Sequence, residues 1–141
     1  MIILDTNVIS EQLRPSASKA VQLWLDSQIA ETLYLTSVSL LELLLGIELL
    51  PEGKRRHALA TAMSGVLQQI FGERILPFDE QAARVYAPIV ARSRASGSAI
   101  SVSDGQIAAI AMSRGFSVAT RDITPFIAAG VTVINPWTNQ V

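Results

Sequence analysis

Four acidic residues, widely separated in the chain, stand where carboxylates can serve in chemistry. They are Asp5, Glu42, Asp104 and Asp122. Carboxylate oxygens are ligands that hard divalent cations such as Mg²⁺ and Mn²⁺ prefer. A divalent cation held in this way lowers the pKa of a bound water and neutralises charge on a phosphate. If the four side chains meet, the sequence predicts a Mg²⁺ or Mn²⁺ site suited to phosphoryl chemistry.

The strands and helices that position these acids are predicted by short apolar runs that alternate with longer helical patterns along the chain. Strands are expected at residues 1–4, 33–36, 75–76, 116–119 and 131–134. Apolar residues recur at helical spacing around residues 20–29, 40–50, 54–72, 82–89 and 107–111. We expect Gly115 to end the helix around residues 107–111 and Pro88 to kink or divide the one around residues 82–89. The leucine stripe of residues 40–50 predicts a nearly buried helix. The alternation predicts an α/β fold: a central, mainly parallel sheet of four to five strands between two layers of helices.

This sheet is expected to bring the acids to one edge. In a parallel sheet, all carboxyl ends of strands lie on the same side, and ligands bind in the crevice there. Asp5 and Asp122 follow strands, whereas Glu42 and Asp104 lie near the starts of helices that lead away from this edge. Four carboxylates this close repel one another unless protons or a cation neutralise them. We therefore expect a cation between them.

Each acid also has a structural interpretation. Asp5 can be a helix N-cap, and Ser39 with Glu42 matches a capping box that would start a helix. Asp104 can cap the helix that follows it, and Asp122 can shape a turn. Taken singly, the capping interpretation is favoured for each. Taken together at one apolar sheet edge, the four favour the metal site.

Polar residues flank the acids in sequence. Thr6, Asn7 and Thr120 can orient water or phosphate through hydroxyl or amide groups, or they can serve only in turns and caps. Arg121 can pair with Asp122 or contact phosphate. We expect Trp137 to belong to the core or to an interface.

Composition excludes several other chemistries. The chain has 141 residues, expected to form one domain over residues 1–141, with no cysteine and a single histidine, His57. Disulfides, thiolate nucleophiles, Cys-ligated zinc and three-His zinc sites are therefore excluded. The sequence also lacks a basic leader and an 18-residue apolar run, so we expect a cytoplasmic protein. The net charge of −1 hides an asymmetry: without the four acids, eight acidic residues face eleven basic ones, a balance of +3.

An ordered set of motifs resembles a known family. Residues 3–10 read ILDTNVIS, and they are followed by Thr36-Ser37, Leu41-Glu42-Leu43, Gly97, Ser103-Asp104, VATRD at 118–122 and INPW at 134–137. The set resembles PIN-domain nucleases, specifically the VapC-type toxins of bacterial toxin–antitoxin pairs, and most of all their FitB branch. The resemblance covers nearly the whole chain.

The resemblance implies a PIN-like three-layer α/β/α fold and a metal-dependent endoribonuclease whose acidic site is Asp5, Glu42, Asp104 and Asp122. It also implies a homodimer and a small DNA-binding antitoxin, with which the toxin assembles on operator DNA. Two positions depart from the pattern. Many relatives carry Asn at the position of Asp122 and an acid where Pro125 stands here, so Asp122 is either a ligand or acts through one. Ser98 stands where relatives often have a basic residue.

Other functions remain open at this stage. A phosphatase would use Asp5 as its nucleophile. That chemistry expects a second acid two residues later, where Asn7 stands. A PIN-fold protein could also bind its antitoxin in a DNA-binding repressor complex without cutting RNA.

For the basic run Lys54-Arg55-Arg56, a solvated helix start is favoured over a phosphate or antitoxin contact.

Overall fold

The structure is a computed structural model that describes residues 1–138. Its strands form one sheet in the order β3-β2-β1-β4-β5, with every neighbouring pair parallel. The strands are β1 (Ile2–Leu4), β2 (Leu33–Thr36), β3 (Ile75–Leu76), β4 (Ser117–Ala119) and β5 (Val133–Ile134). The predicted parallel sheet is confirmed, although β1, β4 and β5 are shorter than expected. Residues 139–141 of the predicted domain lie outside the described part.

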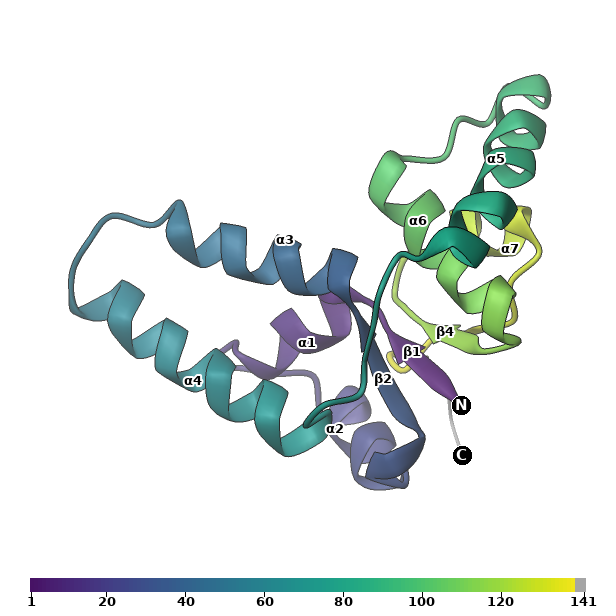
Figure 1. Cartoon of the computed structure of the whole chain (residues 1–141). Coiled ribbons are helices and arrows are strands. Elements are labelled where there is room, and N and C mark those ends of the chain that lie inside the picture. The colour runs from purple at the N-terminus through teal and green to yellow at the C-terminus, as the bar shows by residue number, and fades with distance from the viewer. Residues whose placement is uncertain (139–141) are drawn as a thin grey trace.

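Helices cover both faces of this sheet (Figure 1). They are α1 (Thr6–Gln12), α2 (Lys19–Asp26), the 3-10 helix η1 (Ala30–Thr32), α3 (Ser37–Glu48), α4 (Lys54–Ile70), α5 (Glu80–Ala95), α6 (Val102–Arg114) and α7 (Ile123–Ala129). Ile3 and Leu4 are both fully buried, and because successive strand residues point to opposite faces, they enter different cores. Ile3 packs in the core that includes α5, α6 and α7, and Leu4 in the core that includes α1 to α4. The predicted three-layer α/β/α arrangement is confirmed.

The expectation that residues 40–50 form a nearly buried helix is wrong. Leu43 and Ile47 are buried, whereas Leu41, Leu45 and Leu49 are 55%, 53% and 75% exposed. The reason lies in the packing: α3 continues away from the sheet as one arm of a hairpin with α4 (Figure 1). One face of α3 meets the core, and the opposite face is left open.

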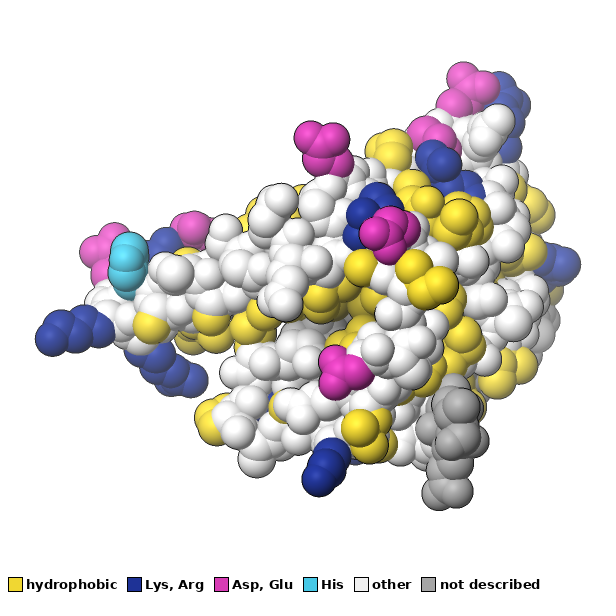
Figure 2. Space-filling view, turned by 90° about the horizontal axis from the view of Figure 1, so that it is seen from below, with side chains coloured by type: hydrophobic (Ala, Val, Ile, Leu, Met, Phe, Trp, Pro, Cys, Tyr) yellow, Lys and Arg dark blue, Asp and Glu magenta, His cyan; other side chains and the backbone are white. Residues whose placement is uncertain are grey.

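The far end of this hairpin carries the basic run at the start of α4 together with the acidic Glu48 and Glu52. Lys54, Arg55 and His57 are exposed at the start of α4, while Arg56 pairs with Glu48 at 2.6 Å. Figure 2 shows the single histidine at the left-hand tip of the molecule, with both magenta acidic and dark blue basic side chains near it. The tip is at the opposite end of the hairpin from the start of α3, where Glu42 lies.

Helix ends differ from two expectations. Thr36, not Ser39, is the N-cap of α3, so Glu42 lies in the second helical turn and not in a capping box. Ser101, not Asp104, is the N-cap of α6. Gly115 does end α6, with the left-handed φ of 70° that favours glycine. Of the two effects expected of Pro88, a kink or a division, the division is wrong, because α5 continues through it.

The strand order determines where a site can form. From the central strand β1 the chain moves outward to β2 and β3, and then returns on the other side of β1 to β4 and β5. The strand order therefore reverses at β1, and in open parallel sheets the crevice for ligands lies at such a point. Among residues 1–138, no helix is both long enough and apolar enough to cross a bilayer.

Candidate active site

Asp5 lies at the carboxyl end of the central strand and is only 6% exposed. Its backbone N–H continues the sheet by donating to the carbonyl of Ala119 at 2.9 Å. Both carboxylate oxygens accept hydrogen bonds, Oδ1 from the Thr6 N–H and Oδ2 from the Thr120 hydroxyl, each at 2.8 Å. The side chain is therefore held in one orientation by the residues that follow β1 and β4.

Thr120 is a junction between these two strand ends. It is fully buried just after β4, and its hydroxyl accepts hydrogen bonds from Asn7 Nδ2 at 3.2 Å and from the backbone N–H of Asp122 at 3.1 Å. The Asn7 side chain in turn accepts from the backbone N–H of Arg121 at 3.3 Å. Thr120 thus orients Asp5 from below the surface, while Asn7 ties α1 to the segment after β4.

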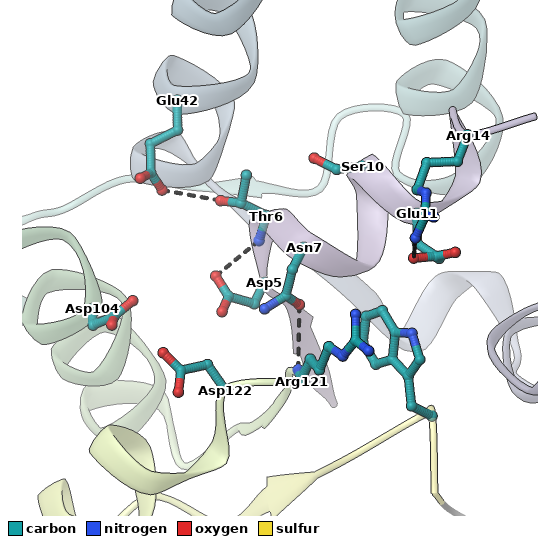
Figure 3. Close-up of a pocket in the computed structure, with 11 residues that line it drawn as sticks. Asp5, Thr6, Asn7, Ser10, Glu11, Arg14, Glu42, Asp104, Arg121 and Asp122 are labelled. Carbon is teal, nitrogen blue, oxygen red and sulfur yellow. Dashed lines mark hydrogen bonds and ion pairs between the residues drawn. The ribbon is translucent and has the colours of Figure 1, made fainter. Parts of the chain in front are cut away.

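Glu42 reaches the same region from α3. Thr6 Oγ1 donates to Glu42 Oε1 at 3.0 Å, which links the first turn of α1 to the second turn of α3. Glu42 is half-buried and its carboxylate points toward Thr6 (Figure 3). The capping box that was the structural alternative for Glu42 does not form, because α3 begins before Ser39.

Asp104 and Asp122 complete the group from the other side of the sheet. Asp104 lies in the first turn of α6, and the next residue, Gly105, packs so closely on α5 that a Cβ there would lie 3.0 Å from Tyr86. Asp122 precedes α7, but its side chain makes no capping hydrogen bond. Figure 3 shows the two carboxylates directed toward each other beside Asp5. The structure therefore brings all four predicted acids to one place.

The electrostatics show that the acids affect one another. The pKa of Asp5 is raised to about 6, chiefly by burial; the hydrogen bonds from Thr120 and Thr6 oppose this shift, and the charges of Asp104 and Glu42 add to it. The pKa of Asp104 is also raised, first by burial and then by the charges of Asp122 and Glu42. A cation among these carboxylates would relieve the repulsion.

The donor set fits a hard divalent cation that keeps part of its water. Within residues 1–138, no three acidic or histidine side chains already converge at ligand spacing, so an all-protein cage is not preformed. Mg²⁺ usually retains several waters and binds through one or two carboxylates. The Asp122 carboxylate accepts no hydrogen bond from the described residues, so its oxygens are available as ligands. The Asp104 carboxylate interacts with the Ser101 side chain, which opposes the rise of its pKa.

The acids line a pocket of about 440 Å³ whose other side is basic. Arg121 lies over the ring of Trp137 with its guanidinium carbon 5.3 Å from the centroid, a cation–π contact. Arg14 Nη1 lies 3.1 Å from Glu11 Oε1. Of the two alternatives for Arg121, pairing with Asp122 or contact with phosphate, the pairing is absent from the ion pairs of the described residues. Two cations are thus held at the rim of an acidic pocket.

Several lining residues were missed by the sequence analysis. Ser10, Glu11 and Arg14 line the pocket beside Asn7, which the sequence had already indicated as a candidate. The four residues follow helical spacing, which places them on one side of α1 and of the turn after it. That spacing was visible in the sequence, but it has meaning only if a helix begins directly after Asp5. Glu11 is buried and accepts from the backbone N–H of Ser18 at 2.8 Å, which lowers its pKa. Its contacts indicate a structural role.

Comparisons with known proteins agree with this geometry. The PIN domain family model matches residues 2–129. The chain is 47% identical over 137 residues to the VapC ribonuclease Y4jK of Sinorhizobium fredii, covering 97% of this chain and 98% of that protein. It is also 47% identical to the toxin FitB of Neisseria gonorrhoeae, covering 97% and 99%. A solved structure of FitAB bound to an IR36 DNA fragment superposes with a TM-score of 0.93, at 45% identity over 100% of this chain and 99% of that one.

The chain therefore belongs to the PIN-domain family, and to the VapC/FitB type of toxin within it. This classification agrees with the resemblance seen in the sequence motifs.

Proposed function

We propose that this protein is a divalent-metal-dependent endoribonuclease that hydrolyses RNA phosphodiester bonds in the cytoplasm as the toxin of a type II toxin–antitoxin pair. The observation that carries the proposal is the arrangement of Asp5, Glu42, Asp104 and Asp122 around one pocket that also has a basic rim. The name of the relative from Sinorhizobium fredii, a VapC ribonuclease, supports RNA as the substrate.

In this proposal, one group of residues holds the cation and a second group keeps its ligand Asp5 in orientation. Asp5, Glu42 and Asp104 would hold Mg²⁺ or Mn²⁺, directly or through water, and Asp122 is the fourth acid of the set. The bound cation would supply an activated water and neutralise charge on the phosphate. Thr6 and Thr120 keep Asp5 in its orientation through their hydrogen bonds.

The basic rim supplies the second part of the substrate site. Arg121 is exposed, carries its charge beside the acids, and is held by Trp137 and by the bond of its own N–H to Asn7. Arg14 is 57% exposed on the same pocket. Guanidinium groups bind phosphate oxygens in paired hydrogen bonds. In this proposal, both arginines contact RNA phosphates on the side of the pocket away from Asp104.

The partner in this proposal is a cognate DNA-binding antitoxin, and the toxin is a homodimer in that assembly on operator DNA. The similar FitAB structure is described as bound to DNA. The open face of α3, with Leu41, Leu45 and Leu49, offers an apolar surface of the kind that protein interfaces cover.

The test uses purified protein free of antitoxin and end-labelled RNA. We expect cleavage within the strand in Mg²⁺ or Mn²⁺, loss of cleavage in a chelator, and recovery when the metal is added back. Cleavage that persists at full rate in the chelator would refute metal dependence. A stable aspartyl-phosphate at Asp5 would instead indicate the phosphatase, and an absence of both metal binding and cleavage would indicate a non-catalytic antitoxin-binding protein.

A further inference from the structure

A second cavity, of about 620 Å³, lies directly beside the acidic pocket. It is enclosed by the end of α5, the segment 96–101, the start of α6 and one side of α7. We call it the flanking cavity. Asp104 and Asp122 line both spaces, so these two carboxylates form their common wall. A polymer whose phosphate lies at the acids can therefore extend from one space into the other.

The lining of the flanking cavity differs from that of the acidic pocket. Ile89, Ile100 and Ala129 give it apolar walls, and Ser98 and Thr124 add hydroxyl groups. Apart from the two shared acids, the only charged residue among its lining residues, all of which are described, is Arg92. Apolar walls combined with hydroxyl donors and acceptors suit a nucleobase, which has apolar faces and polar edges.

One wall of the flanking cavity is already ordered. The Ser93 hydroxyl accepts from the backbone N–H of Ile100 at 2.8 Å and donates to the carbonyl of Ser98. The backbone N–H of Ser98 also donates to the carbonyl of Ser93 at 3.1 Å. Gly97 permits the turn between them with a φ of 76°. The segment is thus fixed to α5, so a base can bind without the loss of conformational entropy that ordering this wall would cost.

We propose that the flanking cavity binds the unpaired nucleobase next to the scissile phosphate and so determines the sequence at which the RNA is cut. The inference rests on the proposed ribonuclease function. Sequence-specific recognition of RNA mostly uses unstacked bases held against protein surfaces, and this cavity is the space of that kind adjoining Asp104 and Asp122.

The experiment fills the cavity without changing the acids. Ala128 is exposed on α7 and lines the cavity, whereas the neighbouring Ile127 is exposed and does not. Ala128→Phe is therefore the test variant and Ile127→Phe the matched control. Each is incubated with a randomised RNA pool and Mn²⁺, and the bases on both sides of every cut are read by sequencing.

We expect wild type and Ile127→Phe to share a base preference at one position beside the cut, and Ala128→Phe to change that preference by about tenfold. Calorimetry should show the same Mn²⁺ affinity for all three proteins. An unchanged preference in Ala128→Phe, with cleavage intact, would overturn the inference and leave the ribonuclease function standing.

A binding assay keeps the inference testable if wild type fails to cut RNA. Fluorescence anisotropy with the four homopolymeric RNA pentamers in Ca²⁺ reports base discrimination directly. The inference predicts that wild type discriminates among the pentamers and that Ala128→Phe loses this discrimination. Equal binding of all four pentamers by wild type would overturn it.

Discussion

The hydroxyl of Thr120 donates a 2.8 Å hydrogen bond to Oδ2 of Asp5, so the end of β4 fixes the carboxylate at the end of β1. The same hydroxyl accepts from Asn7 and from the N–H of Asp122. One buried oxygen therefore connects three of the segments that surround the pocket.

Thr120→Val removes this hydroxyl while keeping the shape of the side chain. We expect cleavage activity to fall by about ten- to a hundredfold, as is usual when a group that orients a metal ligand is lost. The loss should appear in kcat more than in KM, and Thr120→Ser should restore most of it. Because the Thr120 hydrogen bond lowers the pKa of Asp5, the acid side of the pH–rate profile should move to higher pH in the valine variant. A profile that does not move would indicate a purely structural role.

Metal binding should depend on the protonation of Asp5. Its pKa of about 6 lies above the ordinary aspartate value, because burial favours the neutral form. A cation must displace that proton below about pH 6 but not above it. We therefore expect Mn²⁺ affinity, measured by calorimetry, to fall about tenfold for each pH unit below this value and to level off toward pH 8. Equal affinity at pH 5 and pH 7 would contradict the assignment of Asp5 as a ligand.

Glu11 should contribute to stability through a pKa shift in the direction opposite to that of Asp5. The Ser18 N–H and the Arg14 guanidinium favour its charged form, and its folded pKa lies below the ordinary value. This stability is present above the unfolded pKa and is lost as pH falls through the lowered folded pKa. Glu11→Gln should therefore unfold at lower urea than wild type at pH 7, and the difference should shrink toward acid pH. The exposed Glu31, changed to Gln, is the control and should show little difference at either pH.

The acidic site was predictable because the positions of its residues follow from where the parallel strands end. Apolar runs before Asp5 and Asp122 reveal where parallel strands finish, and the shared edge of the sheet follows from their connection by helices. The predicted position of Glu42 was nearly correct for the same reason, even though its capping box does not form. That the acids meet at this edge can therefore be predicted without any knowledge of side-chain contacts.

Arg121 of the basic rim was a candidate because it stands beside Asp122 in the sequence, but Arg14 and the flanking cavity were not predictable in this way. α1 and α7 have seven residues each, too few for a clear helical period, so the pocket face of α1 and the α7 wall of the flanking cavity were not recognised. The contact of Arg121 with Trp137 joins segments that meet only through the pairing of β4 with β5. The exposure of α3 was not predicted because a leucine stripe has the same sequence pattern whether the protein's own core or a partner protein covers it.

The most direct test of the central claim is the rate at which antitoxin-free Asp5→Asn cleaves RNA in Mg²⁺. Asp26→Asn is the matched control, since Asp26 is exposed at the end of α2 and does not line the acidic pocket. Circular dichroism of both variants confirms that they fold. We predict that Asp5→Asn loses more than about a hundredfold in rate while Asp26→Asn cleaves like wild type. Cleavage by folded Asp5→Asn at the wild-type rate would contradict the account.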